Sequence, residues 1–200
     1  MPQLETINHL SPVFNGIEIC AFPITAGPLR AFGRDLKIAF PQFMATFTHH
    51  PSTKERKLSS AVVNLSKVVC VGAVDGERNL IGPLTGGDTP VVERRVTDEI
   101  LDVHRFPIAT FRPLHEEELF LRGLLELHGE QHEITCLKSV TADNLFIKCP
   151  LDTRDYKIPQ HASFLGAIKV DFKFDVMVKI PLSTLQTQGK TKGDAMPMMF

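Results

Sequence analysis

The stretch KVDFKFDVMVKI (residues 169–180) alternates between apolar and polar positions over its whole length. On one side of an extended chain lie Val170, Phe172, Phe174, Val176, Val178 and Ile180. The positions between them are charged, apart from Met177. A period of two over this length predicts a long β-strand with one wet face and one oily face. The oily face must pack against a second sheet or surround a molecule that the chain binds.

Several other segments have the same extended character. Strands are predicted in LKIAFPQFMATF (36–47), KLSSAVVNLSKVVCV (57–71), IATFRPL (108–114), LFLRGLLELHG (119–129), HEITCLKSV (132–140) and NLFIKCPL (144–151), with one more around 13–30. We expect 119–140 to form a hairpin about a turn that contains Gly129. Pro41 indicates a sheet edge or a bulge, and Gly123 either leaves space beside a ligand or marks a bulge.

One segment, TGGDTPVVERRVTDEILDVHRFP (85–107), has helical periodicity instead. Its apolar residues recur at Val92, Val96, Ile100 and Val103. Thr89 is the expected N-cap before Pro90, and Pro107 marks the end of the helix. The prediction is an all-β fold with one short amphipathic helix, as a barrel or a sandwich. It is a single domain over 1–200, with a core of about 13–185 and a C-terminal tail at 186–200.

The composition suits a β domain with a dry interior. Hydrophobic residues make up 43% of the 200 residues, with 14 Phe, one Tyr and no Trp. The net charge is −1 and no basic cluster occurs, which argues against nucleic acid as a partner. No run approaches the roughly 20 apolar residues of a membrane span, and Glu5 stands where a signal peptide carries positive charge. We therefore expect a cytoplasmic protein, or a periplasmic one if a signal has been removed; a homodimer stays open.

The residues that could carry chemistry form no recognisable catalytic or metal-binding pattern. The chain lacks CxxC spacing, so reduced and mostly buried thiols are expected at Cys20, Cys70, Cys136 and Cys149. The eight histidines show neither HxH nor HExxH spacing. His104 lies near the expected helix end, close to Asp102, and His128 and His132 flank a turn. We therefore predict neither catalytic residues nor a metal site.

Three parts of the chain, in this order, resemble the YceI-like family of lipocalin-like, polyisoprenoid-binding proteins. GPLRAFGRDLKIAF (27–40) is similar to a Gly-His-Asp-Leu turn that opens a strand, with Arg34 in place of the histidine. VTDEILDVHRFPIATFRPL (96–114) and FLRGLLELHGEQHEITC (120–136) resemble a helix end that runs through a Phe/Tyr-Pro pair into a strand and a hairpin start. TRDYKIPQHASFLGAIKVDFKFDVMVKIPL (153–182) resembles a Gly-Ala segment before a final long strand, with Lys157 where the family usually has glycine.

The resemblance implies an antiparallel, lipocalin-like, eight-stranded β-barrel with a helix packed against it. It also implies that the protein is not an enzyme and carries a hydrophobic small molecule in the barrel lumen. That molecule would be a polyisoprenoid, a quinone or a related lipid, and no cofactor is required. Many relatives are exported.

The alternating faces predict which side chains line such a lumen. The candidates are Leu36, Ile38, Phe40, Leu121, Leu125, Phe172, Phe174 and Val176. Candidates for holding an anionic or quinone head group are Arg34, Arg105 and Arg112. Two alternatives stay open: a structural or partner-binding β domain with a filled core, and an enzyme acting on a small apolar substrate. The enzyme alternative rests on His104, His128 or His132 with a nearby acid.

Overall fold

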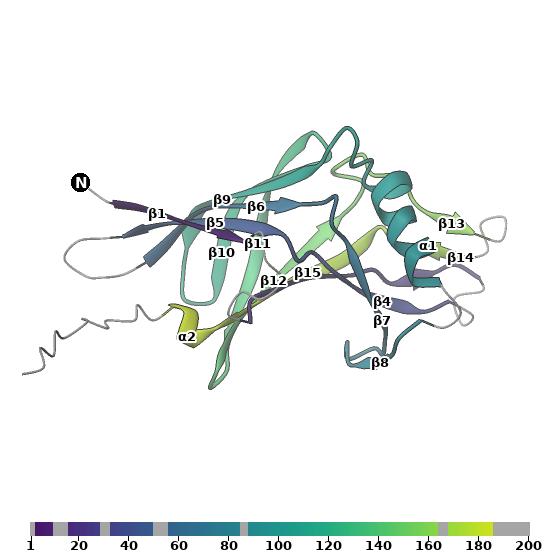
Figure 1. Cartoon of the computed structure of the whole chain (residues 1–200), viewed down its shortest axis with the longest axis horizontal. Helices are drawn as coiled ribbons and strands as arrows, with labels where there is room; N and C mark the ends of the chain where they lie inside the picture. Colours follow the sequence, from purple (N-terminus) through teal and green to yellow (C-terminus); the bar gives the residue numbers. More distant parts are fainter. Residues whose placement is uncertain are drawn as a thin grey trace, which may run out of the picture.

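The fold is built almost entirely from antiparallel strands (Figure 1). The computed structural model describes residues 3–9, 16–28, 33–49, 56–84, 88–163 and 168–185. Its strands are β1 (Gln3–His9), β2 (Glu18–Phe22), β3 (Thr25–Ala26), β4 (Asp35–Ala39), β5 (Phe43–His49), β6 (Arg56–Asn64), β7 (Val69–Val74), β8 (Leu80–Gly82), β9 (Ile108–Glu116), β10 (Phe120–Leu127), β11 (Glu130–Val140), β12 (Asn144–Asp152), β13 (Ala162–Ser163), β14 (Ile168–Val170) and β15 (Lys173–Pro181). Its helical segments are α1 (Asp88–Arg94), the π-helical η2 (Arg95–Ile100) and α2 (Leu182–Leu185). The predicted all-β class is confirmed, while the predicted tail at 186–200 lies outside the described residues.

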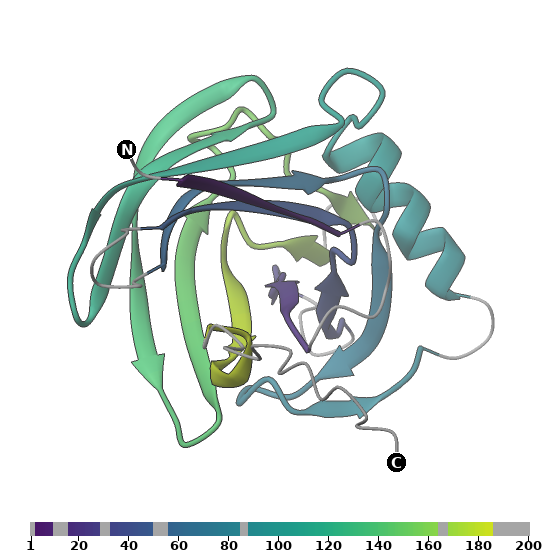
Figure 2. The same cartoon turned by 60° about the vertical axis from the view of Figure 1, so that its left-hand side comes forward.

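One large sheet contains most of the strands. Its order is β1-β5-β6-β9-β10-β11-β12-β15-β2-β4-β7-β8, and the described neighbours pair antiparallel. A small second sheet has the order β13-β14-β3. Figure 2 shows that the large sheet curls round on itself, with α1 against one side. The apolar face of the sheet therefore lies on the inside of the curl, where opposite strands face one another.

The hydrogen-bonded ladder does not close into the predicted barrel. β1 and β8 are its edges, and no pairing joins them in the part of the chain that the structure describes. Residues 40–42 separate β4 from β5, yet β4 pairs with β2 and β7 while β5 pairs with β1 and β6. Pro41 lies in this interruption and has no N–H to give to a ladder. The predicted strand 36–47 is therefore two strands. The bend between them connects β4 and β5, which lie near opposite ends of the sheet order.

A similar interruption divides the predicted strand 57–71. Residues 65–68 separate β6 from β7, and Leu65 and Val68 are both buried there. The Leu65 N–H donates to the carbonyl of Pro107 at 2.8 Å. β6 thus pairs with β5 and β9, and β7 pairs with β4 and β8.

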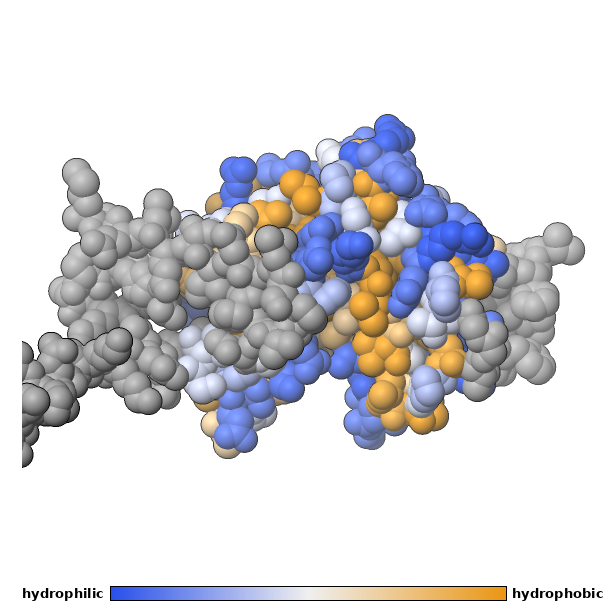
Figure 3. Space-filling view, viewed as in Figure 1, coloured by the Kyte–Doolittle hydropathy of each residue, from blue (hydrophilic) through white to orange (hydrophobic). Residues whose placement is uncertain are grey.

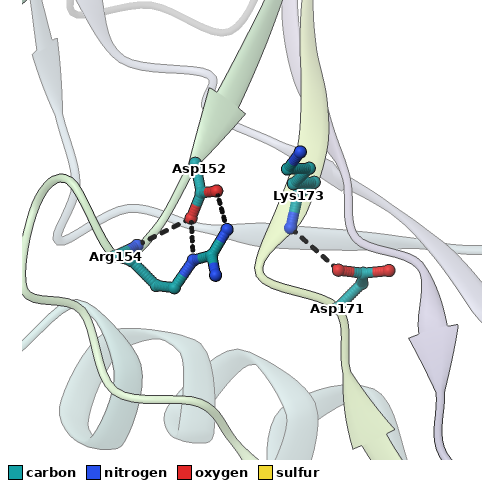
Figure 4. A network of polar contacts seen from close by, with 4 residues as sticks. All are labelled: Asp152, Arg154, Asp171 and Lys173. Atoms are coloured by element: carbon teal, nitrogen blue, oxygen red, sulfur yellow. Dashed lines mark hydrogen bonds and ion pairs between the residues drawn. The ribbon is translucent and has the colours of Figure 1, made fainter.

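The stretch 169–180 is also interrupted. β14 belongs to the small sheet, and β15 begins only after a bend at Asp171 and Phe172. The Asp171 N–H donates to the carbonyl of Ile24 at 2.8 Å, and the Lys173 N–H donates to the Asp171 carboxylate at 3.1 Å (Figure 4). The prediction of one continuous strand is therefore wrong for the first part of this stretch.

The β8 edge carries exposed apolar side chains. Leu80 is 53% exposed and Ile81 is 70% exposed. In Figure 3, hydrophobic side chains gather around this edge, below and to the right of the centre. β8 spans only Leu80–Gly82, and short edge strands offer little backbone for unwanted pairing.

The predicted hairpin over 119–140 is present. β10 and β11 pair from Phe120 with Leu137 to Leu127 with Glu130. The two turn residues, His128 and Gly129, have positive φ angles of 53° and 79°. Two consecutive positive φ angles are typical of the turn that matches the twist of a two-residue hairpin.

The predicted helix is shorter than 85–107 and has two parts. α1 begins at Asp88, one residue before the expected cap Thr89, and η2 continues it to Ile100. Residues 85–87 lie outside the described part of the chain. The Glu93 carboxylate accepts a hydrogen bond from the Cys70 N–H of β7 at 2.9 Å. This bond ties the helix to the sheet.

The expectation of four reduced thiols is wrong for two of them. Cys136 in β11 and Cys149 in β12 form a disulfide. β11 and β12 are paired, and the neighbouring residues Leu137 and Lys148 are direct partners, so the two cysteines lie opposite each other. Cys20 and Cys70 are free and buried, and burial raises the pKa of Cys20 to about 11.

The disulfide should stabilise the fold. Its cysteines are 13 positions apart, and closing a loop of that size stabilises a protein by about 3 kcal/mol. We expect the double variant Cys136→Ala/Cys149→Ala to lose about that much free energy of unfolding in urea titrations. Reductant should destabilise the wild type and leave the double variant unchanged. Identical urea midpoints of the wild type with and without reductant would contradict the disulfide.

Gly123 should tolerate no side chain. The β9–β10 register shifts between Arg122 and Gly123, as a bulge requires, and a Cβ at Gly123 would lie 2.6 Å from the carbonyl oxygen of Arg112 and would also clash with the Phe111 ring. We expect Gly123→Ala to lower the free energy of unfolding by about 1–3 kcal/mol. The control is Gly82→Ala, since a Cβ there meets no atom within 4 Å. Equal stability of the two variants, measured by chemical denaturation, would refute this packing argument.

Candidate functional site

The curled sheet surrounds a cavity of about 580 Å³. Inward-facing side chains of β2, β4, β5, β6, β9, β10, β11, β12 and β15 form its wall, together with α1 and η2. Most of these side chains are aliphatic or aromatic, and the charge-bearing residues of the wall are Arg34, Arg95, Glu116, His161, Lys169 and Asp171. The volume lies within the roughly 300–1,000 Å³ of ordinary small-molecule sites. A core completely filled by its own side chains is therefore not what the structure has.

β15 supplies the apolar row that its sequence predicts. Its wall residues are Phe174, Val176, Val178 and Ile180. The alternate positions face away from the cavity: Asp175 pairs with Lys148 at 3.2 Å and with Arg78, and Lys179 pairs with Glu18 at 3.3 Å. The alternation in the sequence of β15 thus corresponds to one face in the cavity wall and one charged face outside it.

Most of the predicted lumen residues lie in the cavity wall. They are Leu36, Ile38, Phe40, Leu121, Leu125, Phe174 and Val176. Three strands that lie far apart in the sequence, β4, β10 and β15, bring them together. Their part in binding a ligand stays a prediction.

Phe172 is not a wall residue. It lies in the bend before β15, and the Arg154 guanidinium stacks over its ring at 5.2 Å from the centroid. Arg154 also donates from Nε to the Asp152 carboxylate at 2.9 Å, and this bonding lowers the pKa of Asp152 to about 2 (Figure 4). The period of two fails here because Asp171 breaks the strand.

Two of the three predicted head-group residues lie outside the wall. Arg105 is exposed, pairs with Asp102 at 3.4 Å and lies over the Phe106 ring. Arg112 is exposed on β9, one position away from the inward-facing Phe111. Arg34 does line the cavity.

Other wall residues are not among those predicted from the sequence. They include Val92, Val96 and Ile100 of the helix, Ala61 and Val63 of β6, and Leu145, Ile147 and Leu151 of β12. The alternation in NLFIKCPL (144–151) carries the signal for β12. Arg95, His161 and Lys169 have no comparable local signal, because tertiary contacts bring them to the cavity.

The three histidines considered for catalysis lie outside the cavity wall. His128 Nδ1 lies 3.1 Å from the carbonyl oxygen of Tyr156, and the ring of His132 meets the Tyr156 ring edge-on at 5.2 Å. His104 is exposed. The enzyme alternative therefore loses the residues on which it was based.

The described residues contain neither a metal-binding cluster nor a membrane-spanning helix. No group of three or more His, Cys, Asp or Glu side chains among them is arranged to hold a metal ion. None of the helices among them has the length and hydropathy to span a membrane.

No protein-family model matches this chain, and no curated protein matches it in sequence. Its fold is similar to that of BcnA from Burkholderia cenocepacia, with a TM-score of 0.50 and 10% identity over 82% of this chain and 94% of that one. A YceI protein from Campylobacter jejuni is similar with a TM-score of 0.48 and 13% identity, over 72% of this chain and 84% of that one. A mutant of that protein gives the same values. At 10% identity, the likeness to BcnA concerns the fold alone.

The Tyr156 hydroxyl should lose its proton only at unusually high pH. It is 1% exposed, and burial raises its pKa to about 12. Since it is the one tyrosine in the sequence, tyrosinate absorbance reports on it alone. We expect a native midpoint near 12 and a midpoint near 10 in denaturant, as for free tyrosine.

The sign of the stability effect follows from the same shift. A folded-state pKa above the unfolded one stabilises the fold fully below about pH 10, and this contribution is lost as the pH rises towards 12. Tyr156→Phe should remove this alkaline term from the pH profile of the free energy of unfolding. A native midpoint near that of free tyrosine would show that the side chain is not buried.

Proposed function

We propose that this protein binds and carries a long apolar molecule, such as a polyisoprenoid, a quinone or a related lipid, without altering it chemically. The observation that carries the proposal is the cavity of about 580 Å³ with its predominantly apolar wall. Protein interiors are otherwise close-packed, with few voids larger than a water molecule. A space of this size therefore favours a binding role over a packing defect.

The chemistry of the wall favours an apolar occupant over water. A buried water molecule needs about three hydrogen-bond partners, and apolar cavities stay dry. Wall residues such as Phe174, Val176 and Ile38 have side chains that offer none. A hydrocarbon chain suits this surface, because burying it removes apolar area on both sides from water.

The energetics call for a long ligand. Each buried methylene contributes about 0.8 kcal/mol, so ten contribute about 8 kcal/mol. Association itself costs roughly 4–15 kcal/mol. A short chain would therefore bind weakly, and tight binding needs a longer chain or a specific head-group contact.

The proposal includes a lipocalin-like barrel as the working unit. If β4 with β5, and β6 with β7, each count as one bent strand, the strands around the cavity are β2, β4/β5, β6/β7, β9, β10, β11, β12 and β15, which makes eight. The interior of eight strands is either filled by side chains or holds one small ligand, and the cavity of about 580 Å³ favours the ligand. The fold shared with BcnA is consistent with this unit.

An oxidising compartment belongs to the same proposal. The disulfide between Cys136 and Cys149 suits an extracytoplasmic location, since cytosolic thiols are kept reduced. Of the two compartments expected from the sequence, the periplasmic one is therefore the one we propose.

Binding should depend on Phe174 and not on Phe172. An aspartate at Phe174 would put a charge into the apolar wall, whereas Phe172 lies outside it, so Phe172→Asp is a matched control two positions away. We expect organic extraction and mass spectrometry of purified wild type and Phe172→Asp to yield an apolar molecule. Phe174→Asp should yield none. Its affinity for added prenyl alcohol should be at least tenfold lower than that of the wild type, and a tenfold change corresponds to about 1.4 kcal/mol in binding free energy.

A second variant keeps this test independent of folding. Ala61→Phe fills the lumen without adding charge, because Ala61 lines the cavity and is only partly buried. It should melt cooperatively and bind prenyl alcohol more weakly than the wild type. Unchanged binding in both Phe174→Asp and Ala61→Phe, with both folded, would rule out the cavity as the binding site.

A further inference from the structure

The charged residues of the cavity wall are not spread evenly, and several gather at the small sheet. β14 pairs with β3, so Lys169 lies opposite Ala26 and Val170 opposite Thr25. The Val170 N–H donates to the carbonyl of His161 at 3.0 Å. Lys169 and His161 therefore lie at the end of the molecule that β13 and β14 occupy (Figure 1).

Arg34 belongs to the same end. Gly33, directly before it, lies so close to Thr25 that a Cβ would clash with the threonine side chain. The Thr25 N–H donates to the Asp35 carboxylate, directly after Arg34, at 2.7 Å. Both neighbours of Arg34 are thus fixed against β3, which pairs with the strand that carries Lys169.

The helix brings a third cation to this group. Arg95 of η2 lines the cavity, and Glu99 follows it by one turn of the helix. The Glu99 carboxylate lies 3.7 Å from Nδ1 of His161, which connects η2 to the segment that precedes β13. We call Arg34, Arg95 and Lys169 the cationic end of the cavity.

The three residues of the cationic end are not paired with carboxylates in the described structure. No ion pair joins Arg34, Arg95 or Lys169 to an acid in the part of the chain that the structure describes. Asp171 is the wall carboxylate nearby, and it already accepts a hydrogen bond from the Lys173 N–H. The other wall acid, Glu116, is neutralised by Lys138 at 2.6 Å. Among the described wall residues at this end, three are cations and one, Asp171, is a carboxylate. Outside the wall, the Glu99 carboxylate lies beside His161 and the Asp35 carboxylate accepts from the Thr25 N–H, so neither is paired with these cations.

We infer that the ligand is an anionic amphiphile whose carboxylate or phosphate head group is bound by Arg34, Arg95 and Lys169 while its chain fills the apolar cavity. This inference rests on the proposed function and adds the chemical class and the orientation of the ligand. Guanidinium groups bind carboxylate and phosphate through paired hydrogen bonds, and the ammonium adds a compact charge. The rest of the wall is mostly apolar, which suits a hydrocarbon chain.

Three probes with one shared chain separate the head group from the tail. They are geranylgeraniol, geranylgeranoic acid and geranylgeranyl monophosphate, with hydroxyl, carboxylate and phosphate heads. We expect the intact protein to bind the two anionic probes about tenfold more tightly than the alcohol in low-salt calorimetry. The preference should shrink in high salt, because Arg34 and Arg95 are exposed and Lys169 is partly exposed, so that salt screens their charges. The ratio of phosphate to carboxylate binding then tells which head group is preferred.

Charge removal identifies the residues. Arg34→Gln, Arg95→Gln and Lys169→Gln should each weaken binding of the anionic probes about threefold to fivefold, as expected for solvent-accessible ion pairs. The triple variant should abolish the preference for the anionic probes. Affinity for geranylgeraniol should stay within twofold in all of them, which also verifies folding. Arg112→Gln is the matched control, since Arg112 is an exposed arginine outside the cavity wall.

The outcomes separate this inference from the proposed function. Equal affinity for all three probes, or an anionic preference that survives the triple variant, would overturn the inference and leave the carrier function standing. Failure of the intact, delipidated protein to bind any of the probes would overturn both. An anionic preference that the triple variant loses and Arg112→Gln keeps would support the cationic end as the head-group site.

Discussion

A sheet with one apolar face must cover that face, and the described part of this chain has no second sheet of comparable size to do so. The described chain offers α1 and η2 on one side and a three-stranded sheet at one end. The large sheet therefore curls until its strands face one another across the interior. Curvature of this kind needs interruptions in the ladder, and Pro41 supplies one between β4 and β5. The cavity is a consequence of that curl.

Local patterns in the sequence predict those parts of the site that depend on one strand alone. The alternation of Phe174, Val176, Val178 and Ile180 predicts their common direction, because successive side chains of a strand point to opposite faces. The pattern cannot tell where the strand begins. By its position in the alternation, Phe172 should face the same way as Phe174. However, the Asp171 N–H donates to the carbonyl of Ile24, and the resulting bend places Phe172 outside the cavity wall.

The parts that the sequence did not predict all depend on contacts between distant segments. Cys136 and Cys149 are joined because β11 and β12 pair in one particular register, which spacing alone does not specify. Arg95 and Lys169 come from a helix and a short strand, and only the tertiary structure brings them to the same end of the cavity. Arg105 and Arg112 were equally good candidates by residue type, but they lie outside the cavity wall.

The small residues of the wall explain why the lumen stays open when the chain has 14 phenylalanines with which to fill it. Several wall positions carry only a methyl group: Ala21, Ala45, Ala61 and Ala109. They belong to β2, β5, β6 and β9, so the space is kept from several sides, while bulky residues such as Phe40, Phe111 and Phe174 supply apolar area around it. Filling these positions with larger side chains would have given a better-packed core, since interiors gain from close packing. A wall that combines methyl groups with phenylalanines gives up that packing and retains an apolar surface.

The charged residues then have to lie where water or a counter-charge can reach them, because an unpaired charge in the apolar middle would be strongly unfavourable. The same constraint that keeps the middle of the cavity apolar thus confines its cations to one end.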